Sequence, residues 1–334
     1  MVNSSILQKE RSNMVKINSY EQTGILPVIN IPKASLAVEV ATALRNGGVN
    51  SIEVTLRSPD SLESIKNIKT AFPDMTVGAG TVLTTQLVDD AISHGADFIV
   101  TPGYDDKVVD YCISKDILIV PGCVTATEMQ KAVAVGLKTL KFFPAELNGG
   151  IDAINLLSGP FPNVKFIPTG GINFKNLGTY LSNKKILACG GSYMATKQQI
   201  ENGDFDGITA ACKKAIDISL GFELAHIGIN CDNEEGAVNV AKTISQIFRT
   251  EPRYMNSAIF AGTAVEAVKS GGIGKYGHIG YYTNSIERAI AYFEAYNIPI
   301  NENGIKRNNK GEITCVYLQN EVGNFALHVV QNNK

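Results

Sequence analysis

Short apolar runs alternate with helix-like stretches from Gly24 to about Leu220, and this alternation limits the fold more than any other feature of the sequence. Helix-like stretches separate most of the runs, and several end at a glycine, as helices commonly do. Strands that alternate with helices at this spacing predict parallel βαβ units. The eight strand-like runs are Leu26–Asn30, Ser51–Leu56, Thr76–Val82, Phe98–Pro102, Leu118–Val124, Thr139–Pro144, Lys165–Thr169 and Ile186–Ser192.

Eight such units in about 200 residues fit an α/β fold, the (β/α)8 TIM barrel. A doubly wound open sheet is the alternative, but it normally carries a glycine-rich fingerprint after its first strand. The turn in that place reads N-I-P-K-A-S, which has no glycine. We therefore predict a barrel over residues 20–220. Residues 1–19 form a polar leader that lacks the apolar core of a signal peptide.

Residues 221–334 differ from the preceding residues in their sequence pattern and contain an internal repeat. The tetrapeptide His226-Ile-Gly-Ile returns as His278-Ile-Gly-Tyr 52 positions later. Each copy is followed by a helix-like, acidic and alanine-containing stretch, at 234–248 and 285–296, and then by an apolar strand pair. Two similar β-α-β-β halves predict a second, smaller α+β domain.

Composition and charge exclude several classes of function. The 334 residues include 30 basic and 32 acidic side chains, so the net charge of −2 offers no basic surface to nucleic acid. No run of about 18 apolar residues is present to span a membrane. Six cysteines are scattered singly, which argues against a disulfide framework or a zinc ribbon. We expect a cytoplasmic protein with a small-molecule partner, bound neither to nucleic acid nor to a membrane.

Strand periodicity directs several charged side chains into the barrel. Side chains alternate between the two faces of a strand, so where Leu140 and Phe142 pack against helices, Lys141 faces the barrel axis. The same alternation turns Glu53 and Arg57 inward. Buried charges cost on the order of several kcal/mol unless they are paired. They are either a structural ion-pair cluster or an active site, and their place at the ends of strands favours an active site.

Lys141 is the most informative of these residues, because its segment T-L-K-F-F-P-A-E is otherwise largely apolar. A desolvated lysine beside a second cation gives up its proton readily, and the neutral amine can form a Schiff base with a ketone. The resulting iminium accepts electrons when a neighbouring C–C bond breaks. Glu53 is the available proton shuttle, while Arg57 and the Thr81 hydroxyl can hold a substrate carboxylate.

Two glycine-rich strand ends follow the seventh and eighth strands, at Thr169-Gly170-Gly171 and Gly190-Gly191-Ser192. Many barrels bind phosphate at these two places through backbone N–H groups. Together the two segments predict a phosphate site. A phosphate-binding isomerase or synthase that forms no Schiff base would keep both segments, and it remains the alternative to the lysine chemistry.

Seven segments resemble the bacterial 2-dehydro-3-deoxy-phosphogluconate / 4-hydroxy-2-oxoglutarate aldolase family, in order and over roughly residues 20–218. The resemblance implies a class I, metal-free aldolase on a (β/α)8 barrel, usually a homotrimer. Its substrate would be a phosphorylated 2-keto sugar acid that yields pyruvate and glyceraldehyde 3-phosphate. Cleavage of 4-hydroxy-2-oxoglutarate to pyruvate and glyoxylate is an open second activity. The segments are SIEVTLRSP (51–59), GAGTVL (78–83), TPG (101–103), PGCVTATE (121–128), LKFFPAE (140–146), FIPTGGI (166–172) and GGSYM (190–194).

The resemblance also implies roles for individual residues. Lys141 matches the Schiff-base lysine, and Glu53 matches the general acid/base, acting through a water. One departure is Tyr193, which stands where the family usually has tryptophan. The positions that match substrate-binding residues are Arg57 and Thr81 for the pyruvyl carboxylate, Phe143 for the wall of that pocket, Thr169 for the sugar-acid chain, and Gly171, Gly191 and Ser192 for the phosphate.

The second domain is similar to the glyoxalase/bleomycin-resistance (vicinal oxygen chelate) superfamily, which is built from paired β-α-β-β-β modules. The positions that match its metal ligands are His226, Glu266, His278 and His328, a set that suits Zn, Ni, Mn or Fe. The superfamily's last ligand is typically glutamate, so His328 is a departure. The domain would then hold a divalent metal and carry a separate glyoxalase-type activity. The alternative is a degenerate domain for assembly or small-molecule binding, in which the histidines are merely packed.

Overall fold

The computed structural model describes residues 19–332, and the chain divides into two compact units, Met1–Ser219 and Leu220–Lys334. Of the expected leader, residues 1–18 lie outside the described residues. Within residues 19–332, no helix combines the length and the apolar character that crossing a membrane requires.

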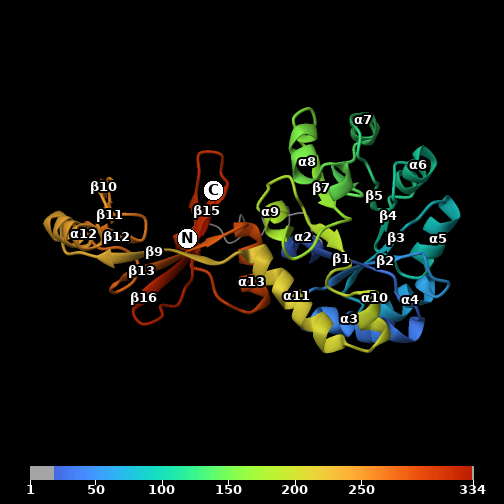
Figure 1. Ribbon diagram of the computed structural model, residues 1–334, viewed down its shortest axis with the longest axis horizontal. Coiled ribbons are helices and arrows are strands. Elements are labelled where there is room, and N and C mark those ends of the chain that lie inside the picture. The colour runs from blue at the N-terminus through green and yellow to red at the C-terminus, as the bar shows by residue number, and fades with distance from the viewer. Residues whose placement is uncertain (1–18, 333–334) are drawn as a thin grey trace, which may run out of the picture. The chain divides into compact units, whose positions relative to one another are not determined.

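Eight parallel strands form the first unit, as the sequence predicts (Figure 1). Six of them pair in the order β5-β4-β3-β2-β1-β8, and β6 pairs with β7. Parallel bridges from Gly122 to Lys141 and from Thr169 to Gly190 join the two groups at both edges, which closes the barrel. The strands are β1 Ile25–Ile29, β2 Ser51–Thr55, β3 Thr76–Gly80, β4 Phe98–Val100, β5 Ile119–Val120, β6 Thr139–Phe142, β7 Lys165–Pro168 and β8 Cys189–Gly191.

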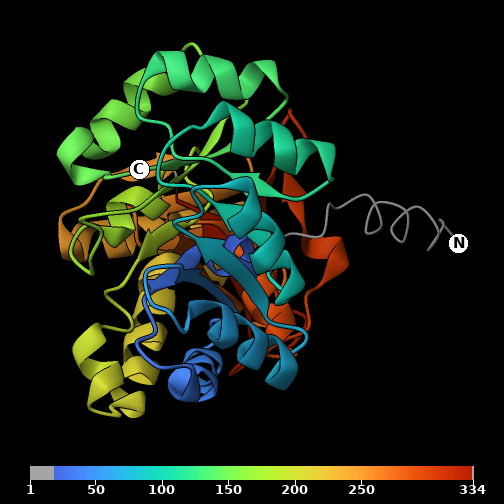
Figure 2. The same ribbon diagram turned by 90° about the vertical axis from the view of Figure 1, so that its right-hand side faces the viewer.

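Helices lie outside these strands, which Figure 2 shows from the barrel side. Several begin where a side chain caps the first turn, as Thr84, Asp105 and Thr125 do by accepting a hydrogen bond from a backbone N–H of that turn. The helices are α2 Ser19–Thr23, α3 Ala37–Asn46 after the 3-10 turn η1 Ala34–Leu36, α4 Ser61–Ala71, α5 Thr85–Ser93, α6 Asp106–Ser114, α7 Ala126–Ala134, α8 Gly150–Ser158 after η2 Glu146–Asn148, α9 Leu177–Leu181, α10 Lys197–Glu201 and α11 Phe205–Leu220.

The barrel has two apolar layers, which the alternation of side chains along each strand creates. Val54 and Phe142 belong to the layer between strands and helices, where they are fully buried. Phe98 and Ile167 belong to a second cluster, inside the barrel. Tyr20 of α2 packs on Phe98 there, with ring centroids 5.4 Å apart. The predicted outward direction of alternate side chains in β2 and β6 is therefore confirmed.

The second unit is one eight-stranded sheet in the order β10-β11-β12-β9-β13-β16-β15-β14. Its two halves repeat the order β-α-β-β-β, so each helix is followed by three strands rather than the pair expected from the residue pattern. The halves meet where β9 runs antiparallel to β13. The elements are β9 Glu223–Asn230, α12 Glu234–Phe248, β10 Pro252–Tyr254, β11 Ala258–Ala261, β12 Val265–Val268, β13 Gly277–Thr283, α13 Ile286–Ala295, η3 Glu302–Gly304, β14 Lys306–Arg307, β15 Ile313–Tyr317 and β16 Phe325–Gln331.

Candidate functional site

A buried ion pair joins β2 and β6 inside the barrel. Lys141 Nζ lies 3.0 Å from Glu53 Oε1 and 3.4 Å from Oε2. The two residues are only 6% and 1% exposed, so each charge depends on the other for the stabilisation that water would otherwise supply. A Cβ at Gly80 would lie 2.2 Å from Glu53 Oε1, which means that glycine at this position makes room for the carboxylate.

The surroundings of Lys141 hold its amine in place. Its backbone N–H donates to the Pro121 carbonyl, and its carbonyl accepts from the Cys123 N–H, so the strand is fastened to the segment after β5. The ammonium nitrogen lies 5.4 Å from the centre of the Phe143 ring. Because the carboxylate is within hydrogen-bond distance, one proton transfer would give a neutral amine and a neutral acid without help from bulk water.

Arg57 and Thr81 meet just beyond the ends of β2 and β3. Arg57 Nε donates a hydrogen bond to Thr81 Oγ1 over 3.3 Å. Thr81 has φ +62°, a left-handed conformation that is strained for a β-branched residue and that tends to occur at functional positions. Among residues 19–332 no carboxylate forms an ion pair with Arg57, which leaves its guanidinium to an incoming anion.

The Thr169 segment offers polar groups without protein partners. Thr169 Oγ1 is buried and has no hydrogen-bond partner within residues 19–332. Gly170 and Gly171 have φ of +94° and +86°, a backbone turn that glycine adopts without strain. The N–H of Gly171 donates no hydrogen bond inside the described chain. Ser192, at the end of the next strand, is exposed. These groups suit a ligand with hydroxyl and anionic oxygens.

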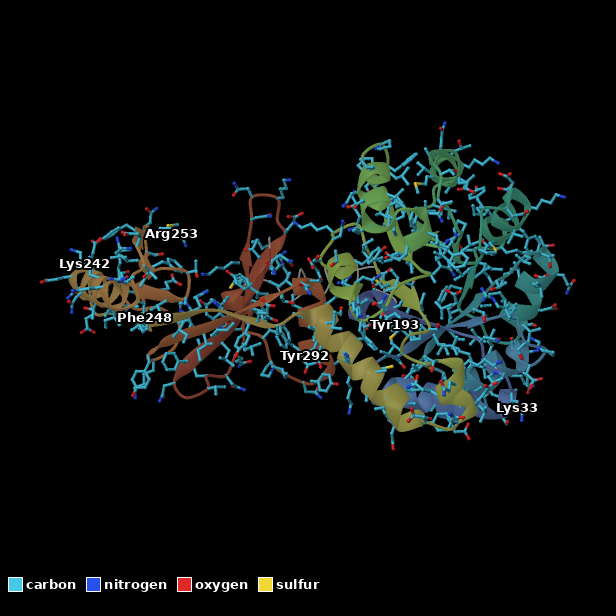
Figure 3. The ribbon with its side chains drawn as sticks, in the orientation of Figure 1. Lys33, Tyr193, Lys242, Phe248, Arg253 and Tyr292 are labelled. Carbon is cyan, nitrogen blue, oxygen red and sulfur yellow. The ribbon has the colours of Figure 1, made fainter. Side chains whose placement is uncertain are left out.

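Tyr193, labelled in Figure 3, directly follows Ser192, and its ring packs against Gly191 and Phe174. A Cβ on Gly191 would lie 2.6 Å from its ring, and the ring of Phe174 meets it edge to face at 5.2 Å. The Tyr193 hydroxyl is buried without a partner in the described chain, and burial raises its pKa far above the usual range. The phenol therefore fills space here but leaves one polar atom unsatisfied.

The second unit gathers three histidines and one glutamate from four strands. His226 Nε2 lies 3.1 Å from His278 Nε2, and Glu266 Oε2 lies 3.1 Å from His278 Nε2 and 3.4 Å from His226 Nε2. Ligand atoms of His226, His278 and His328 all lie within 4.8 Å of one another. All four predicted ligands therefore converge on one place.

This cluster fits a divalent metal in geometry and in chemistry. Ligand atoms bound at about 2.1 Å to one ion lie roughly 3.0 to 3.5 Å apart, which matches the separations between His226, His278 and Glu266. His328 Nε2 is buried and has no partner within residues 19–332, although buried polar atoms are normally satisfied. Burial and the neighbouring imidazoles lower the pKa of His226, and that of His328 to about 3. Both therefore present the neutral form that binds metals.

Two glycines explain how the imidazoles fit between adjacent strands. In the antiparallel register His226 lies opposite Gly280, and His278 lies opposite Gly228. A Cβ at Gly228 would be 2.1 Å from the His278 ring, and one at Gly280 would be 2.2 Å from His328 Nε2. The first half thus provides His226 and, at Gly228, the space for His278. The second half provides His278 and His328 and, at Gly280, the space for the His226 and His328 rings. These glycines were not among the predicted site residues, although the repeated H-x-G pattern contains them.

Cys315 and Tyr317 form the far side of His328. Cys315 Sγ lies 3.7 Å from His328 Nδ1, and burial raises the pKa of the thiol to about 11, so it stays protonated near neutral pH. The Tyr317 ring centre lies 4.6 Å from that of His328. No pattern along the chain indicates either residue, because their contact with His328 arises only when β15 pairs with β16.

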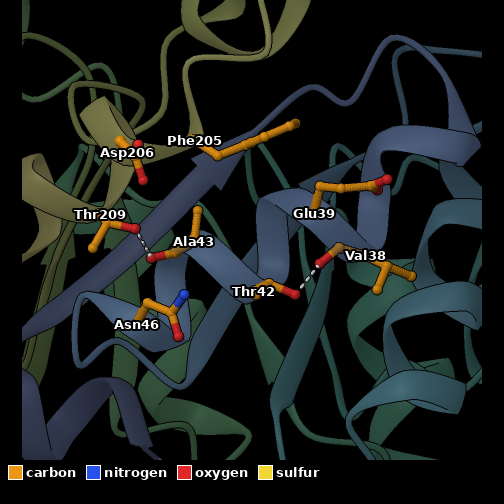
Figure 4. Close-up of a pocket in the computed structure, with 8 residues that line it drawn as sticks. All are labelled: Val38, Glu39, Thr42, Ala43, Asn46, Phe205, Asp206 and Thr209. Atoms are coloured by element: carbon orange, nitrogen blue, oxygen red, sulfur yellow. Dashed lines mark hydrogen bonds between the residues drawn. The ribbon is translucent and has the colours of Figure 1, made fainter.

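A surface groove of about 290 Å³ lies elsewhere on the barrel, between α3 and α11 (Figure 4). The hydroxyl of Thr209 spans the two helices by donating to the Ala43 carbonyl. Since both helices lie on the outside of the barrel, this groove is separate from the lumen that holds Lys141. Its lining residues are Val38, Glu39, Thr42, Ala43, Asn46, Phe205, Asp206 and Thr209.

Comparison with known proteins assigns the barrel to a family. Residues 17–211 match the family model described as KDPG and KHG aldolase. The 2-dehydro-3-deoxy-phosphogluconate aldolase of Treponema pallidum is 40% identical over 198 residues, which is 59% of this chain and 94% of that protein. The KHG/KDPG aldolase of Escherichia coli is 39% identical over 193 residues, covering 58% of this chain and 91% of that protein.

Solved structures that resemble this chain are aldolases of the same family. A KDPG aldolase from Legionella pneumophila, with pyruvate captured as a covalent carbinolamine intermediate, has a TM-score of 0.58 and 35% identity. The match spans 59% of this chain and 96% of the Legionella chain. The aldolase of Zymomonas mobilis, solved with 3-phosphoglycerate, has a TM-score of 0.57 and 36% identity over 61% of this chain and 96% of its own. The chain therefore belongs to the KDPG and KHG aldolase family, the class I lyases that its motifs resemble.

Proposed function

We propose that this protein cleaves 2-dehydro-3-deoxy-6-phosphogluconate to pyruvate and glyceraldehyde 3-phosphate, with Lys141 as the Schiff-base residue. The observation that carries the proposal is the buried Lys141–Glu53 pair in the barrel of an aldolase-family chain. The Legionella relative supports it, since a carbinolamine is the first adduct of an amine with a ketone. Arg57 and Thr81 hold the substrate carboxylate beside the lysine.

The first half of the reaction makes the electron acceptor. Glu53 takes a proton from the Lys141 ammonium, and the free amine attacks the C2 carbonyl to give a carbinolamine. Loss of water, with the proton supplied by Glu53, leaves an iminium between Nζ and C2. This cation takes the place of a metal as electron sink, so the barrel needs no metal cofactor.

The second half breaks the C3–C4 bond. Glu53, acting through a water, removes the proton of the C4 hydroxyl, and C4 becomes the aldehyde carbon of glyceraldehyde 3-phosphate. The bonding electrons move into the iminium and form the enamine of pyruvate. Protonation at C3 and addition of water then release pyruvate and restore Lys141. Phe143 forms the wall beside the pyruvyl group, where its ring already contacts the lysine.

The remaining site residues bind the rest of the substrate. The unpartnered Thr169 hydroxyl faces the sugar-acid chain, and Gly171, Gly191 and Ser192 receive the phosphate. Backbone N–H groups that point into a turn donate hydrogen bonds to phosphate oxygens, and their partial positive charges attract the anion. The Zymomonas relative, solved with 3-phosphoglycerate, supports a phosphorylated ligand. 4-Hydroxy-2-oxoglutarate lacks the phosphate and would use only the pyruvyl end of the site as a second substrate.

Borohydride trapping tests this proposal. Incubation with pyruvate and borohydride should attach one pyruvyl group to Lys141, located by peptide mass spectrometry. Lys141→Ala should stay unlabelled, while Lys131→Ala, which changes an exposed lysine, should label normally. An unlabelled wild-type chain that still binds sugar phosphates would instead support the isomerase or synthase alternative.

We also propose that the barrel assembles as a homotrimer, as its family resemblance implies. Leu147 of η2 and Leu156 of α8 support an interface on the outside of the barrel, since they are 88% and 80% exposed. Light scattering after size exclusion should give about three times the chain mass of 35.9 kDa. Leu147→Glu with Leu156→Glu should lower that mass. A wild-type protein of single-chain mass would refute the trimer.

For the second unit we propose a divalent metal site formed by His226, Glu266, His278 and His328. The unpartnered Nε2 of His328 and the short distances between the other ligand atoms support it. A bound ion would act as a Lewis acid on an oxygen of a small ligand, which is the chemistry that a separate glyoxalase-type activity needs.

Elemental analysis of the full-length protein tests the metal site. Gently purified wild-type chain should carry close to one metal per chain, and His278→Ala should lose it. Chelation should leave aldol cleavage unchanged, because the barrel chemistry uses none of these residues. A wild-type content below about 0.1 metal per chain would favour the alternative of a metal-free binding or assembly domain.

A further inference from the structure

The side chain of Glu146 lies under the glycine turn at the end of β7. A Cβ built on Gly171 would be 2.4 Å from Glu146 Cγ and 2.6 Å from its Cβ, so the aliphatic stem is in direct contact with the turn. The Gly171 carbonyl is held from the other direction by the side-chain amides of Asn173 and Asn176, at 3.0 and 3.1 Å. The turn is therefore supported at two points.

Tyr180 holds the other end of Glu146. The Tyr180 hydroxyl, on α9, donates a short hydrogen bond to Glu146 Oε1. Tyr180 is only 2% exposed, and burial together with this hydrogen bond raises the pKa of its hydroxyl, which therefore remains a donor. Gly150 leaves room for the pair, because a Cβ there would lie 3.0 Å from the hydroxyl and 3.1 Å from Oε1.

The backbone of the same segment ties this arrangement to the lysine strand. The N–H of Ala145 donates to the Thr169 carbonyl over 2.8 Å, and that of Glu146 donates to the Gly170 carbonyl over 3.1 Å. Residues 141–146 thus carry Lys141 at one end and the support of the glycine turn at the other. The distance between the amine and the turn is set within six residues.

A carboxylate this close to an anion-binding turn is unfavourable unless it is fixed. Like charges repel, and the repulsion grows where water is scarce. The stem of Glu146 touches Gly171, whereas its carboxylate oxygen lies beside Gly150 and Tyr180. Tyr180 therefore keeps the negative charge at a defined place while the stem supports the turn.

We propose that Glu146 and Tyr180 are positioning residues that set the Gly170–Gly171 turn for the phosphate group of the substrate. The inference rests on the proposed aldolase function, and it concerns phosphate affinity rather than the chemistry at Lys141. Tyr180→Phe frees the carboxylate, and Glu146→Ala removes the stem, so both weaken phosphate binding. Glu146→Gln keeps the stem and an oxygen that accepts from Tyr180, so it restores the wild-type behaviour.

Three measurements on the full-length protein test this inference. The KM for the phosphorylated substrate should rise about tenfold in Tyr180→Phe and Glu146→Ala, and calorimetry should show weaker binding of inorganic phosphate. The rate of borohydride trapping with pyruvate, which has no phosphate, should stay at the wild-type value in both variants. Glu146→Gln should resemble wild type in all three.

The outcomes separate this inference from the aldolase proposal. An unchanged KM in Tyr180→Phe would overturn the positioning role, as would an equal loss of pyruvate trapping, which indicates general damage. If Glu146→Ala fails to fold, Tyr180→Phe and Glu146→Gln still decide the question. A wild-type chain that binds phosphate but is never trapped with pyruvate would overturn the aldolase proposal alone.

Discussion

The two clusters of buried polar side chains in this chain are stabilised in opposite ways. In the barrel, Lys141 and Glu53 satisfy each other as an ion pair at 3.0 Å. In the second unit, three imidazoles and a single carboxylate lie close together, and His328 Nε2 has no partner in the described chain. The Lys141–Glu53 pair can transfer a proton between its two members. A buried polar atom without a hydrogen-bond partner, such as His328 Nε2, can instead bind a ligand. An unsatisfied imidazole nitrogen among other ligand-type side chains is thus the more specific sign of a binding site.

The largest expected effect removes the reactive amine. Lys141→Ala should reduce kcat for aldol cleavage about 10⁴-fold or more, because no Schiff base can form. Steady-state kinetics with coupled pyruvate detection measure it. The metal content of the same variant should equal wild type, and a simultaneous loss of metal would show that the two clusters are not independent.

The next test breaks the ion pair from one side. Lys141→Met leaves the Glu53 carboxylate buried and uncompensated, so the free energy of unfolding should fall by about 3 kcal/mol. Urea denaturation measures the change. Adding Glu53→Gln should recover most of it, since the remaining group carries no charge. If the single and double variants are equally unstable, the loss comes from packing and not from charge.

A smaller effect should follow from filling the space of an imidazole. Gly228→Ala keeps all four ligands but places a methyl group where the His278 ring lies, so metal affinity should fall about 10- to 100-fold. Competition with a fluorescent chelator measures the affinity. Gly236→Ala is the matched control, because the nearest atoms there are at an ordinary 3.6 Å. Equal affinities in the two variants would contradict the reciprocal arrangement of glycines and histidines.

Cys315 should affect the metal more weakly. Its thiol lies 3.7 Å from His328 Nδ1, so it helps to orient the ring that presents Nε2 to the cluster. Cys315→Val should weaken metal binding about tenfold, and Cys315→Ser should retain most of the affinity. The same chelator assay applies, with Cys231→Ser as control. A Val variant with wild-type affinity would limit Cys315 to packing.

The smallest effect concerns an unpartnered polar atom outside the two clusters. The Tyr193 hydroxyl is buried and unsatisfied, like His328 Nε2, but it lies outside both clusters. Tyr193→Phe removes it and should raise the free energy of unfolding by about 1 kcal/mol, with no change in cleavage or metal content. A destabilised variant would reveal a hydrogen bond that the structure does not account for.

Regular elements were predictable because their signals are local. The eight strand runs follow from apolar periodicity, and the helix Glu234–Phe248 was expected with its observed bounds. The superfamily resemblance implied three strands after each helix, but the residue pattern alone missed the first of them. These strands, β10 and β14, are short, largely exposed edge strands without an apolar run. Thr81 does not follow the alternation of side-chain directions in β3, because it lies just after the end of the strand and has a positive φ.

The candidate site was predictable as a set of residues but not as a geometry. Family motifs and strand faces identify Lys141 and Glu53, which lie 88 positions apart. The contact between Glu146 and Tyr180 crosses 34 positions between two short elements, and no periodicity links them. Partners of this kind depend on tertiary packing, which a pattern along one chain does not encode.

The reciprocal glycines have a consequence for the ancestry of the second unit. A glycine of each repeat makes room for an imidazole of the other repeat. The cluster therefore forms only at the seam, the line where β9 pairs with β13, and neither repeat can form it alone. Two copies of the first repeat would form a seam with two histidines and two glutamates, and two copies of the second would form one with four histidines. Two separate copies of a single ancestral repeat could therefore have paired and formed such a seam before their genes were fused. Glu266 and His328 hold corresponding positions, beside Gly228 and Gly280, so they are the one pair of ligands in which the two repeats differ.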